Sequence, residues 1–368
     1  MNRVVLGDIA EIITGPFGSM LHKSDYVEEG FPLVMPQDIG DRIINFDSIA
    51  KISEIDAIRL EKYEAVENDI IYARRGDVEK HAFVVSEYGK IFCGTGCLRV
   101  RVNPEKANPL FISFYLSRPE SREWISKHAV GSNMPNINTE ILSDVPIELS
   151  DKAQQQKVVD FLSATERKIL HNRKINDNLS VMAYDTYMHT FYGKKPNGKL
   201  SDILVENDKS KVQVGEAKES DGEYPFFTSG EAILRWKEHF VDGRNCFLNT
   251  GGNADVKFYV GKAAYSTDTW CISANQNLGD YLYLLLLSIK PELNKKFFQG
   301  TGLKHLQKPL LKDRPIYIPT TDEITTFNSQ IPHWFDIIAE NTRENQHLTA
   351  LRDWLLPMLM NGQATISE

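Results

Sequence analysis

The feature that most constrains this chain is an internal repeat. The segment from Gly131 to Ile147 and the segment from Gly300 to Ile316 share a pattern of glycine, polar and apolar residues, 169 residues apart and without a gap. The register continues in these pairs: Ile169 and Ile338, Asn172 and Asn341, Asn176 and Asn345, Leu179 and Leu348, Gly193 and Gly362. Two copies are too few for a solenoid. We therefore expect a duplicated unit, with a variable module followed by a more uniform one.

The variable modules match each other more loosely. Residues 6–9 (Leu-Gly-Asp-Ile) resemble residues 200–203, and residues 70–76 resemble residues 246–252. The separation between matching residues drifts here, so the two modules differ by insertions. Short strand-like runs alternate with turn residues in both, and each module carries two predicted short helices. These lie at 110–116 and 121–129 in the first module and at 281–288 and 292–299 in the second.

The uniform part of each copy is a predicted long helix. No glycine or proline interrupts the sequence from Asp151 to Phe191, and seam residues recur at alternating spacings of four and three, as in a coiled coil. A helix of about 40 residues is roughly 60 Å long. Because the second helix must return the chain, the two helices should pair antiparallel. Pro332 predicts a late start or a kink in the second helix, and Pro357 a bent or ended last turn.

Asparagines recur at the same two seam positions of each copy: Asn172 and Asn176 in the first, Asn341 and Asn345 in the second. A buried asparagine weakens a coiled-coil seam but fixes its register. We expect these asparagines to pair between the helices. The alternative is that they are solvated and that the seam is shifted by one position.

The resulting fold class is α+β, with two mixed α/β domains joined by two long helices that form an antiparallel coiled coil with an approximate twofold axis. Head one spans residues 1–150 and the first helix 151–195. Head two spans residues 196–320 and the second helix 321–368.

Composition limits the function classes. The longest apolar run, Tyr281 to Leu287, is too short to cross a membrane. The N-terminal residues do not read as a signal peptide, so we expect a cytoplasmic protein. Cysteines stand at 93, 97, 246 and 271 without a second pair at zinc-binding spacing, which favours reduced thiols over a zinc site. We expect neither a metal nor a cofactor.

Four stretches, in this order, resemble the specificity subunit of type I restriction–modification systems. They are residues 6–9, residues 68–76, residues 131–147 and the glutamine-rich start of the first helix at 154–157. The resemblance covers essentially the whole chain. It implies that each head is a target-recognition domain for one half of a split double-stranded DNA sequence. It also implies that the helices set the gap between the halves and hold two methyltransferase (modification) subunits, which motor–nuclease (restriction) subunits can join. The proline at 332 and an acidic second helix depart from the pattern.

Reading DNA in the major groove requires arginine or lysine for guanine and asparagine or glutamine for adenine, on loops held by a rigid frame. Two loops in each head meet this requirement. The candidates in head one are Arg74, Arg75, Lys80, Ser132, Asn133 and Asn136, and those in head two are Asn249, Thr250, Asn253, Lys257, Thr301, Lys304 and His305. The alternatives are surface ion pairs of an arginine with Asp77 or Glu79, a glycine hairpin turn at 251–252, and plain polar turns. Candidate phosphate contacts, or else solvated charges, are Arg99, Arg101, Lys127, Lys295 and Lys296.

Two other classes of function compete with this interpretation. Residues 108–111 (Asn-Pro-Leu-Phe) approximate a methyltransferase motif, but no glycine-rich methyl-donor loop precedes them and no phosphate-binding loop for ATP is present. We therefore expect a non-catalytic subunit rather than a self-contained methyltransferase or nuclease. The formal net charge of −8 favours a non-DNA coiled-coil scaffold, unless the DNA-binding face is locally basic or partners supply the phosphate contacts. Because the heads differ, we expect an asymmetric bipartite target whose spacer is comparable to one turn of DNA, about 34 Å.

Overall fold

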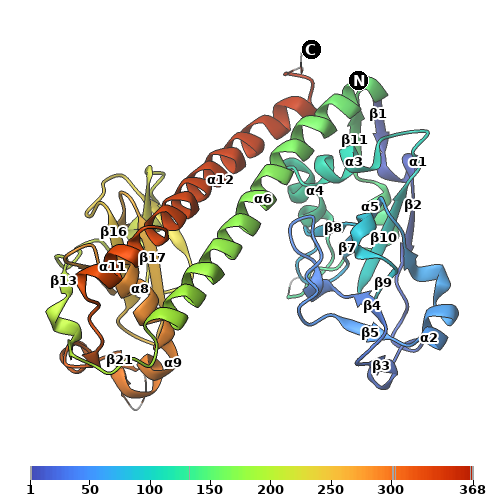
Figure 1. The fold of residues 1–368 in the computed structure, drawn as a ribbon. Helices are drawn as coiled ribbons and strands as arrows, with labels where there is room; N and C mark the ends of the chain where they lie inside the picture. Colours follow the sequence, from blue (N-terminus) through green and yellow to red (C-terminus); the bar gives the residue numbers. More distant parts are fainter. Residues whose placement is uncertain (1, 132, 301, 303, 365, 367–368) are drawn as a thin grey trace. The chain divides into compact units, whose positions relative to one another are not determined.

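The structure is a computed structural model that describes residues 2–131, 133–300, 302, 304–364 and 366. It divides into two compact units, Met1–Arg167 with Leu348–Glu368, and Lys168–His347. We call them the head-one unit and the head-two unit. Each contains one head and a stretch of both long helices (Figure 1). The domain boundaries proposed from the sequence and the twofold relation of the heads stay predictions.

The head-one unit is built around three sheets. A four-stranded antiparallel sheet has the order β2 (Ala10–Thr14), β10 (Cys97–Val102), β7 (Asp69–Ala73), β8 (His81–Phe83). A five-stranded sheet has the order β3 (Tyr26–Val27), β5 (Ala50–Ile52), β4 (Phe31–Val34), β9 (Ile91–Cys93), β6 (Glu64–Ala65). The first and last strands of the head, β1 (Asn2–Val5) and β11 (Pro146–Leu149), pair antiparallel. Every residue of β7 is buried, and all but Asp69 are apolar or aromatic, which fits a strand between two neighbours in a sheet.

The helices of head one pack on these sheets. They are α1 (Leu6–Ile9), α2 (Glu54–Arg59), α3 (Pro109–Leu116), α4 (Pro119–His128) and α5 (Thr139–Ser143), with short 3₁₀ turns at Lys23–Asp25, Pro36–Asp38, Glu61–Tyr63 and Ser86–Tyr88. Asn108 caps α3 by accepting hydrogen bonds from the backbone N–H groups of Leu110 and Phe111, and proline takes the first helical position. Both helices predicted for head one are present.

The head-two unit repeats the same central sheet. Its strand order is β13 (Leu204–Glu206), β19 (Thr269–Ala274), β16 (Arg244–Asn249), β17 (Val256–Val260), which corresponds strand for strand to the sheet of head one. The other strands are β14 (Tyr224–Phe227) between β15 (Ile233–Trp236) and β18 (Ala264–Tyr265), β12 (Gly198–Lys199) with β22 (Pro315–Ile316), and β20 (Phe298–Gln299) with β21 (His305–Leu306). The remaining short elements are a 3₁₀ turn at Leu200–Asp202, α7 (Val214–Lys218), α8 (Gly279–Ser288), α9 (Lys290–Glu292), a π-helix at Leu293–Phe297 and α10 (Lys308–Lys312).

One predicted element of head two is wrong at its end. The helix expected over 292–299 stops at Phe297, and Phe298–Gln299 form β20 instead. Antiparallel pairing of β20 with β21 fixes the extended backbone there. The paired residues are only six to eight positions apart, but the apolar and polar pattern of 292–299 does not show where the helix gives way to this hairpin.

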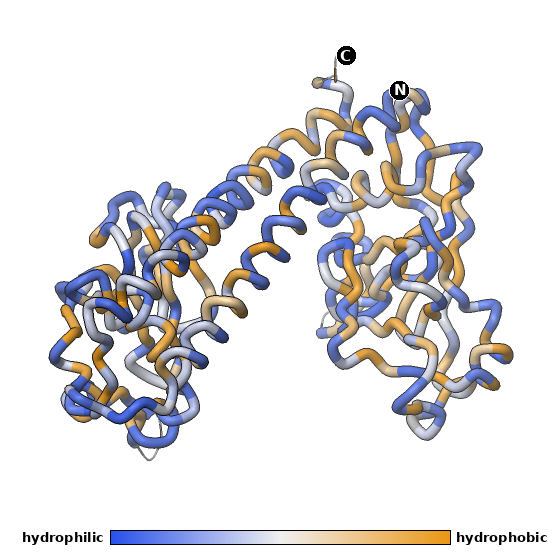
Figure 2. Tube along the Cα trace, in the orientation of Figure 1, coloured by the Kyte–Doolittle hydropathy of each residue, from blue (hydrophilic) through white to orange (hydrophobic). Residues whose placement is uncertain are grey.

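The long helices are present as predicted. The first is α6 (Lys152–Thr190), and the second is broken into α11 (Thr321–Asn328) and α12 (Ile331–Met360). Pro332 lies in the first turn of α12, as its late start requires, and Pro357 lies inside the last turn. Many residues in the middle of α6 are hydrophilic (Figure 2).

Within each unit the two long helices pack against each other and run in opposite directions. In the head-one unit, the core contains Val158 and Leu162 from the start of α6 together with Leu356 and Leu359 from the end of α12. In the head-two unit, the core contains Ala183, Tyr187 and Phe191 from the end of α6 with Phe327, Ile331 and Phe335 from the start of the second helix. The long helices therefore form the expected antiparallel coiled coil.

Candidate nucleic-acid interface

Two loops of head one, each predicted separately from the sequence to read DNA, are joined by main-chain hydrogen bonds in the structure. The loop between β7 and β8 lies beside the loop that follows α4. The backbone N–H of Ile137 donates to the carbonyl of Arg74 at 3.0 Å, and the N–H of Gly76 donates to the carbonyl of Pro135 at 3.1 Å. Between these bonds, Arg75 and Asn136 form an antiparallel bridge.

Head two builds the same element at matching positions. The N–H of Leu306 donates to the carbonyl of Thr250 at 3.0 Å, and the N–H of Gly252 donates to that of Lys304 at 2.9 Å. Gly251 and His305 form the bridge between them. The exact repeat register pairs Asn136 with His305, and the looser upstream match pairs Arg75 with Gly251. We call this element the joined loops of each head.

The main chain of the joined loops is held on the central sheet. Arg74 N–H donates to the Gly96 carbonyl at 2.8 Å, and Thr250 N–H donates to the Asp268 carbonyl at 3.1 Å. The loops turn at glycines with positive φ, 79° at Gly76 and 85° at Gly252, a conformation that costs glycine little. Because these backbone groups are already paired, recognition falls to the side chains.

In head one, several predicted reading side chains face solvent. Arg75 and Asn133 are exposed and have no hydrogen bond or ion pair within the described part of the chain. Lys80 is exposed and forms an ion pair with Asp77 at 2.8 Å. The sequence had suggested Asp77 as a possible ion-pair partner of an arginine. Arg74 is half-buried, and its Nε is buried without a partner among the described residues. Asn136 is half-buried, and Ser132 lies outside the described residues.

In head two, three predicted readers hold the loop instead. The buried amide of Asn249 donates to the carbonyls of Gly251 at 2.7 Å and Asn253 at 2.5 Å, and its oxygen accepts from a backbone N–H. Lys257 donates to the Thr228 carbonyl at 2.9 Å and also to that of Gly230. Thr250 donates its hydroxyl to the Asp268 carbonyl at 2.9 Å. Their polar atoms are used within the head, and a contact of these three side chains with DNA stays a prediction.

The remaining candidates of head two are more accessible. Asn253 and His305 are exposed, and Lys304 is half-buried. Thr301 lies outside the described residues. The exposed joined-loop side chains therefore differ between the heads: Arg75 and Asn133 in one, and Asn253 and His305 in the other.

The structure corrects the phosphate contacts proposed for Arg99 and Arg101. Arg99 is buried, where it donates to the carbonyls of Lys62 at 3.1 Å and Glu64 at 2.7 Å. Arg101 binds the buried carboxylate of Asp69 at 2.7 Å. Both lie on β10 and face charged or carbonyl oxygens of head one. Lys127 and Lys296 form ion pairs with acidic residues on their own helical turns, whereas Lys295 is exposed.

The four seam asparagines form two pairs inside the head-two unit. Asn172 Nδ2 donates to Asn345 Oδ1 at 3.0 Å, and Asn341 Nδ2 donates to Asn176 Oδ1 at 2.9 Å. Asn172 is almost fully buried. The arrangement is the paired one rather than the solvated one. That these pairs fix the helix register stays a prediction.

The cysteines are buried in strands and form no disulfide: Cys93 in β9, Cys97 in β10, Cys246 in β16 and Cys271 in β19. Burial raises the pKa of the Cys93 thiol to about 12, so it is protonated and unreactive at neutral pH. Within the described ranges, no three metal-binding side chains gather into a group. No helix there combines the length and the apolar character that a membrane span requires.

Fold and site together define a two-headed recognition protein on a coiled coil: two similar heads each present joined loops with different side chains. A sequence profile described as "Type I restriction modification DNA specificity domain" matches residues 1–180 and 194–350, and the chain belongs to this family of DNA target-recognition subunits. The resemblance found in the sequence is thereby confirmed.

Similar proteins agree with this assignment. The type I restriction enzyme MjaIX specificity subunit of Methanocaldococcus jannaschii is 20% identical, over 69% of this chain and 69% of its own. The HindI specificity subunit of Haemophilus influenzae is 24% identical over 97% of this chain and 98% of its own. The crystal structure of a type I restriction–modification S subunit from M. genitalium has a TM-score of 0.67 at 15% identity, covering 97% of this chain and 95% of that one. At such identity the structural likeness shows the fold alone.

Proposed function

We propose that this chain reads an asymmetric, bipartite double-stranded DNA target, one half-site with each head, and catalyses no step itself. The observation that carries this proposal is the joined-loop element, which is built twice by the same backbone hydrogen bonds. Conserved main-chain geometry with different side chains is what two readers of different half-sites need. Base identity in the major groove is distinguished by side-chain donors and acceptors.

Different bases follow from the different side chains. Arg75 suits the two acceptors of guanine, and Asn133 and Asn136 suit the donor and acceptor of adenine. In head two, Asn253 suits adenine, whereas Lys304 and His305 suit a guanine edge or a nearby phosphate. Arg74 and Lys80 extend the basic side of the head-one loop, and Ser132 and Thr301 stay predicted members of the same loops.

Partner subunits would supply what this chain lacks. We expect two methyltransferase subunits on the long helices, with restriction subunits joining them, in the cytoplasm. Relatives that carry the name of specificity subunits of type I restriction enzymes support this arrangement. The formal net charge of −8 is compatible with this arrangement if the partners provide many of the phosphate contacts that DNA binding requires from basic residues.

Methylome sequencing tests the proposal. A host that carries the chain together with its modification subunit should gain one split methylated motif with two unlike half-sites, and the motif should vanish when the gene is deleted. A continuous palindromic motif would contradict the proposal. Purified chain alone, incubated with DNA and a methyl donor, should transfer no methyl group. Transfer by the isolated chain would show that it is an enzyme.

The acidic charge also favours one competing function, a coiled-coil scaffold that does not touch DNA. Salt dependence separates the two. A complex that contacts phosphates through this chain and its partners loses DNA affinity steeply as salt rises. Exchange of head one for the head of another family member should change only one half of the motif. An unchanged motif would support the scaffold.

A further inference from the structure

The main chain of Arg42 forms hydrogen bonds with the hairpin of β7 and β8, which carries the first joined loop of head one. Its N–H donates to the carbonyl of His81 at 2.9 Å, and its own carbonyl accepts from the N–H of Phe83 at 3.2 Å. These residues form β8, the strand that receives the chain from the first joined loop. Arg42 adopts a φ of 62°, which is rare for a residue with a side chain and persists only where the surroundings fix it.

The side chain of Arg42 reaches the first long helix. This side chain is 9% exposed, and its guanidinium donates to Glu166 Oε1 of α6 at 2.5 Å. It also donates to the Ser113 hydroxyl at 3.0 Å and lies 3.6 Å from the centre of the Phe114 ring. Arg352 of α12 approaches the same Glu166 oxygen at 3.7 Å. One carboxylate thus binds the head and the second helix together.

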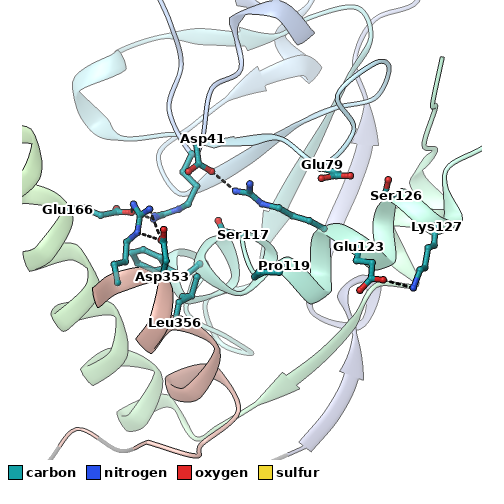
Figure 3. A pocket seen from close by; sticks show the side chains of 14 residues that line it. Asp41, Glu79, Ser117, Pro119, Glu123, Ser126, Lys127, Glu166, Asp353 and Leu356 are labelled. Atoms are coloured by element: carbon teal, nitrogen blue, oxygen red, sulfur yellow. Dashed lines mark hydrogen bonds and ion pairs between the residues drawn. The ribbon is translucent and has the colours of Figure 1, made fainter. Parts of the chain in front are cut away.

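This contact borders a cavity of the head-one unit. The cavity has a volume of about 630 Å³. Figure 3 shows Glu166 and Asp353 at one end of it, with Asp41 beside them. Glu79, in the loop between β7 and β8, lies farther along its wall. The same cavity is therefore lined by the Arg42–Glu166 ion pair and by Glu79 of the loop between β7 and β8.

Head two has a corresponding contact between head and helix, but its arginine lies on a different element of the head. Arg244 begins β16, the strand that leads directly into the joined loops. It donates to Asp336 Oδ1 of α12 at 2.6 Å and to the carbonyl of Pro332 at 2.9 Å. Its Nε also binds the buried carboxylate of Asp280 on α8 at 2.9 Å.

The two carboxylates occupy the same turn of the repeat. In the exact register, Glu166 corresponds to Phe335, the residue next to Asp336. The two arginines do not correspond, because Arg42 precedes β5 whereas Arg244 begins the strand equivalent to β7. Plain inheritance of one duplicated contact does not explain this match. In both heads the same helical turn is thus linked to a strand beside the joined loops, through arginines at different positions of the head.

We infer that Arg42–Glu166 and Arg244–Asp336 are positioning clamps that fix the direction in which each head presents its joined loops from its stretch of helix. Through this direction they restrict the separation of half-sites that the protein accepts. The inference rests on the proposed function. Arginine suits the task because its planar, always charged group holds a carboxylate in a defined geometry. An ion pair contributes little net stability whether it is largely buried, as at Arg42, or partly exposed, as at Asp336, so a geometric role accounts better for the presence of both.

The test uses the chain assembled with its modification subunits and a set of DNAs with both half-sites fixed and the spacer lengthened or shortened by single base pairs. Glu166→Gln and Asp336→Asn remove the charge of each clamp and keep its size. Wild type should methylate one spacer length strongly. Each variant should lower that preference by about tenfold, equivalent to about 1.4 kcal/mol, and leave the preference for half-site sequence unchanged.

Matched controls lie on the same helices. Asp177→Asn on α6 and Glu340→Gln on α12 remove exposed carboxylates without a described partner, and should leave the spacer preference as in wild type. Arg244→Lys, at a half-exposed clamp, serves if Glu166→Gln fails to fold, and should relax the preference less than Asp336→Asn does. Clamp variants that keep the wild-type spacer preference, or that lose half-site discrimination instead, would overturn the inference. A wild-type complex with no bipartite target would overturn the proposed function itself.

Discussion

The two heads share their scaffold but not the polar groups inside it. Their central sheets have the same strand order, and the joined loops use the same hydrogen bonds. In head one, Asp69 of β7 binds Arg101 at 2.7 Å with Arg99 beside it. In head two, the corresponding residue is Asn245, which accepts from the Asn207 amide at 3.0 Å. A charged network has been exchanged for a neutral one without a change of topology.

This exchange also alters the space inside the head. The strand registers place Ser273 of β19 where Arg101 stands on β10. Head two has a cavity of about 510 Å³ there, lined by Asn207, Asn245 and Ser273 among others. The comparison teaches that backbone pairing and burial specify the fold, whereas interior polar partners can diverge as long as each remains hydrogen-bonded.

The largest expected effect tests this exchange directly. Asp69→Asn should destabilise the head-one unit by about 3 kcal/mol, because it removes the buried carboxylate that binds Arg101 and lies beside the buried Arg99. Asn245→Ala should cost the head-two unit only about 1–3 kcal/mol, since it removes a neutral hydrogen bond. Denaturant unfolding of the full chain, followed by hydrogen exchange in each head, measures both. Equal losses would show that the two networks are energetically alike.

The next effect concerns the joined loops. Arg75→Ala should reduce discrimination at one base pair of the head-one half-site by about 1–3 kcal/mol, a loss of roughly five- to 150-fold, and leave the other half-site intact. His305→Ala should act on the head-two half-site alone, by the same amount or less. Methylation rates on single-base variants of each half-site measure the change. Lys62→Ala, an exposed charge outside the loops, is the control. Relaxation of both half-sites by one substitution would break the two-reader interpretation.

Acid should affect the heads in opposite directions. In head one, burial, followed by the charges of Arg42 and Arg122, lowers the pKa of His81 to about 3. His81 is therefore neutral when folded, whereas the unfolded chain takes up a proton near pH 6.5. Its contribution to stability is complete above pH 6.5 and is lost as the pH falls toward 3. At pH 5 the loss is about 2 kcal/mol.

In head two, burial raises the pKa of Asp280 to about 6 despite its contact with Arg244. The charged carboxylate is the costly form, so the cost is complete above pH 6 and is relieved as the pH falls toward 4. At pH 5 the head-two unit should gain about 1 kcal/mol from this group. Unfolding at pH 7.5 and pH 5 measures both slopes. His81→Gln and Asp280→Asn should flatten one slope each, and a slope that survives its own substitution would refute that assignment.

Features with long regular patterns were predictable from the sequence. The helices α6 and α12 follow from seam spacing over many turns, and the loops were found because they recur in both heads, the second of them in exact register. Their joining was not predicted, since it depends on hydrogen bonds between segments about 60 residues apart in each head, such as Arg74 and Ile137.

Single side chains were harder to assign. Asn249, Lys257 and Thr250 are residue types that read DNA, but the fold uses their polar atoms to hold the loop. Sequence alone cannot show which carbonyl an amide or an ammonium group will meet. Arg42 and Arg244 were missed because no periodicity or motif marks them, and each gains its meaning only from a carboxylate on a distant helix.

The smallest effect concerns the helix seam, which is apolar in the head-one unit and contains asparagine pairs in the head-two unit. Asn172→Ala should destabilise the head-two unit by about 1 kcal/mol, because it removes the hydrogen bonds that the buried Asn172 amide donates to Asn345 and Glu344. The double variant Asn172→Leu with Asn345→Leu should be as stable as wild type or more so, since apolar side chains pack better at a seam. If the pair fixes register, the double variant should also show a second register in distance measurements between spin labels on α6 and α12. A single register in that variant would assign the pair to solubility rather than to alignment of the helices.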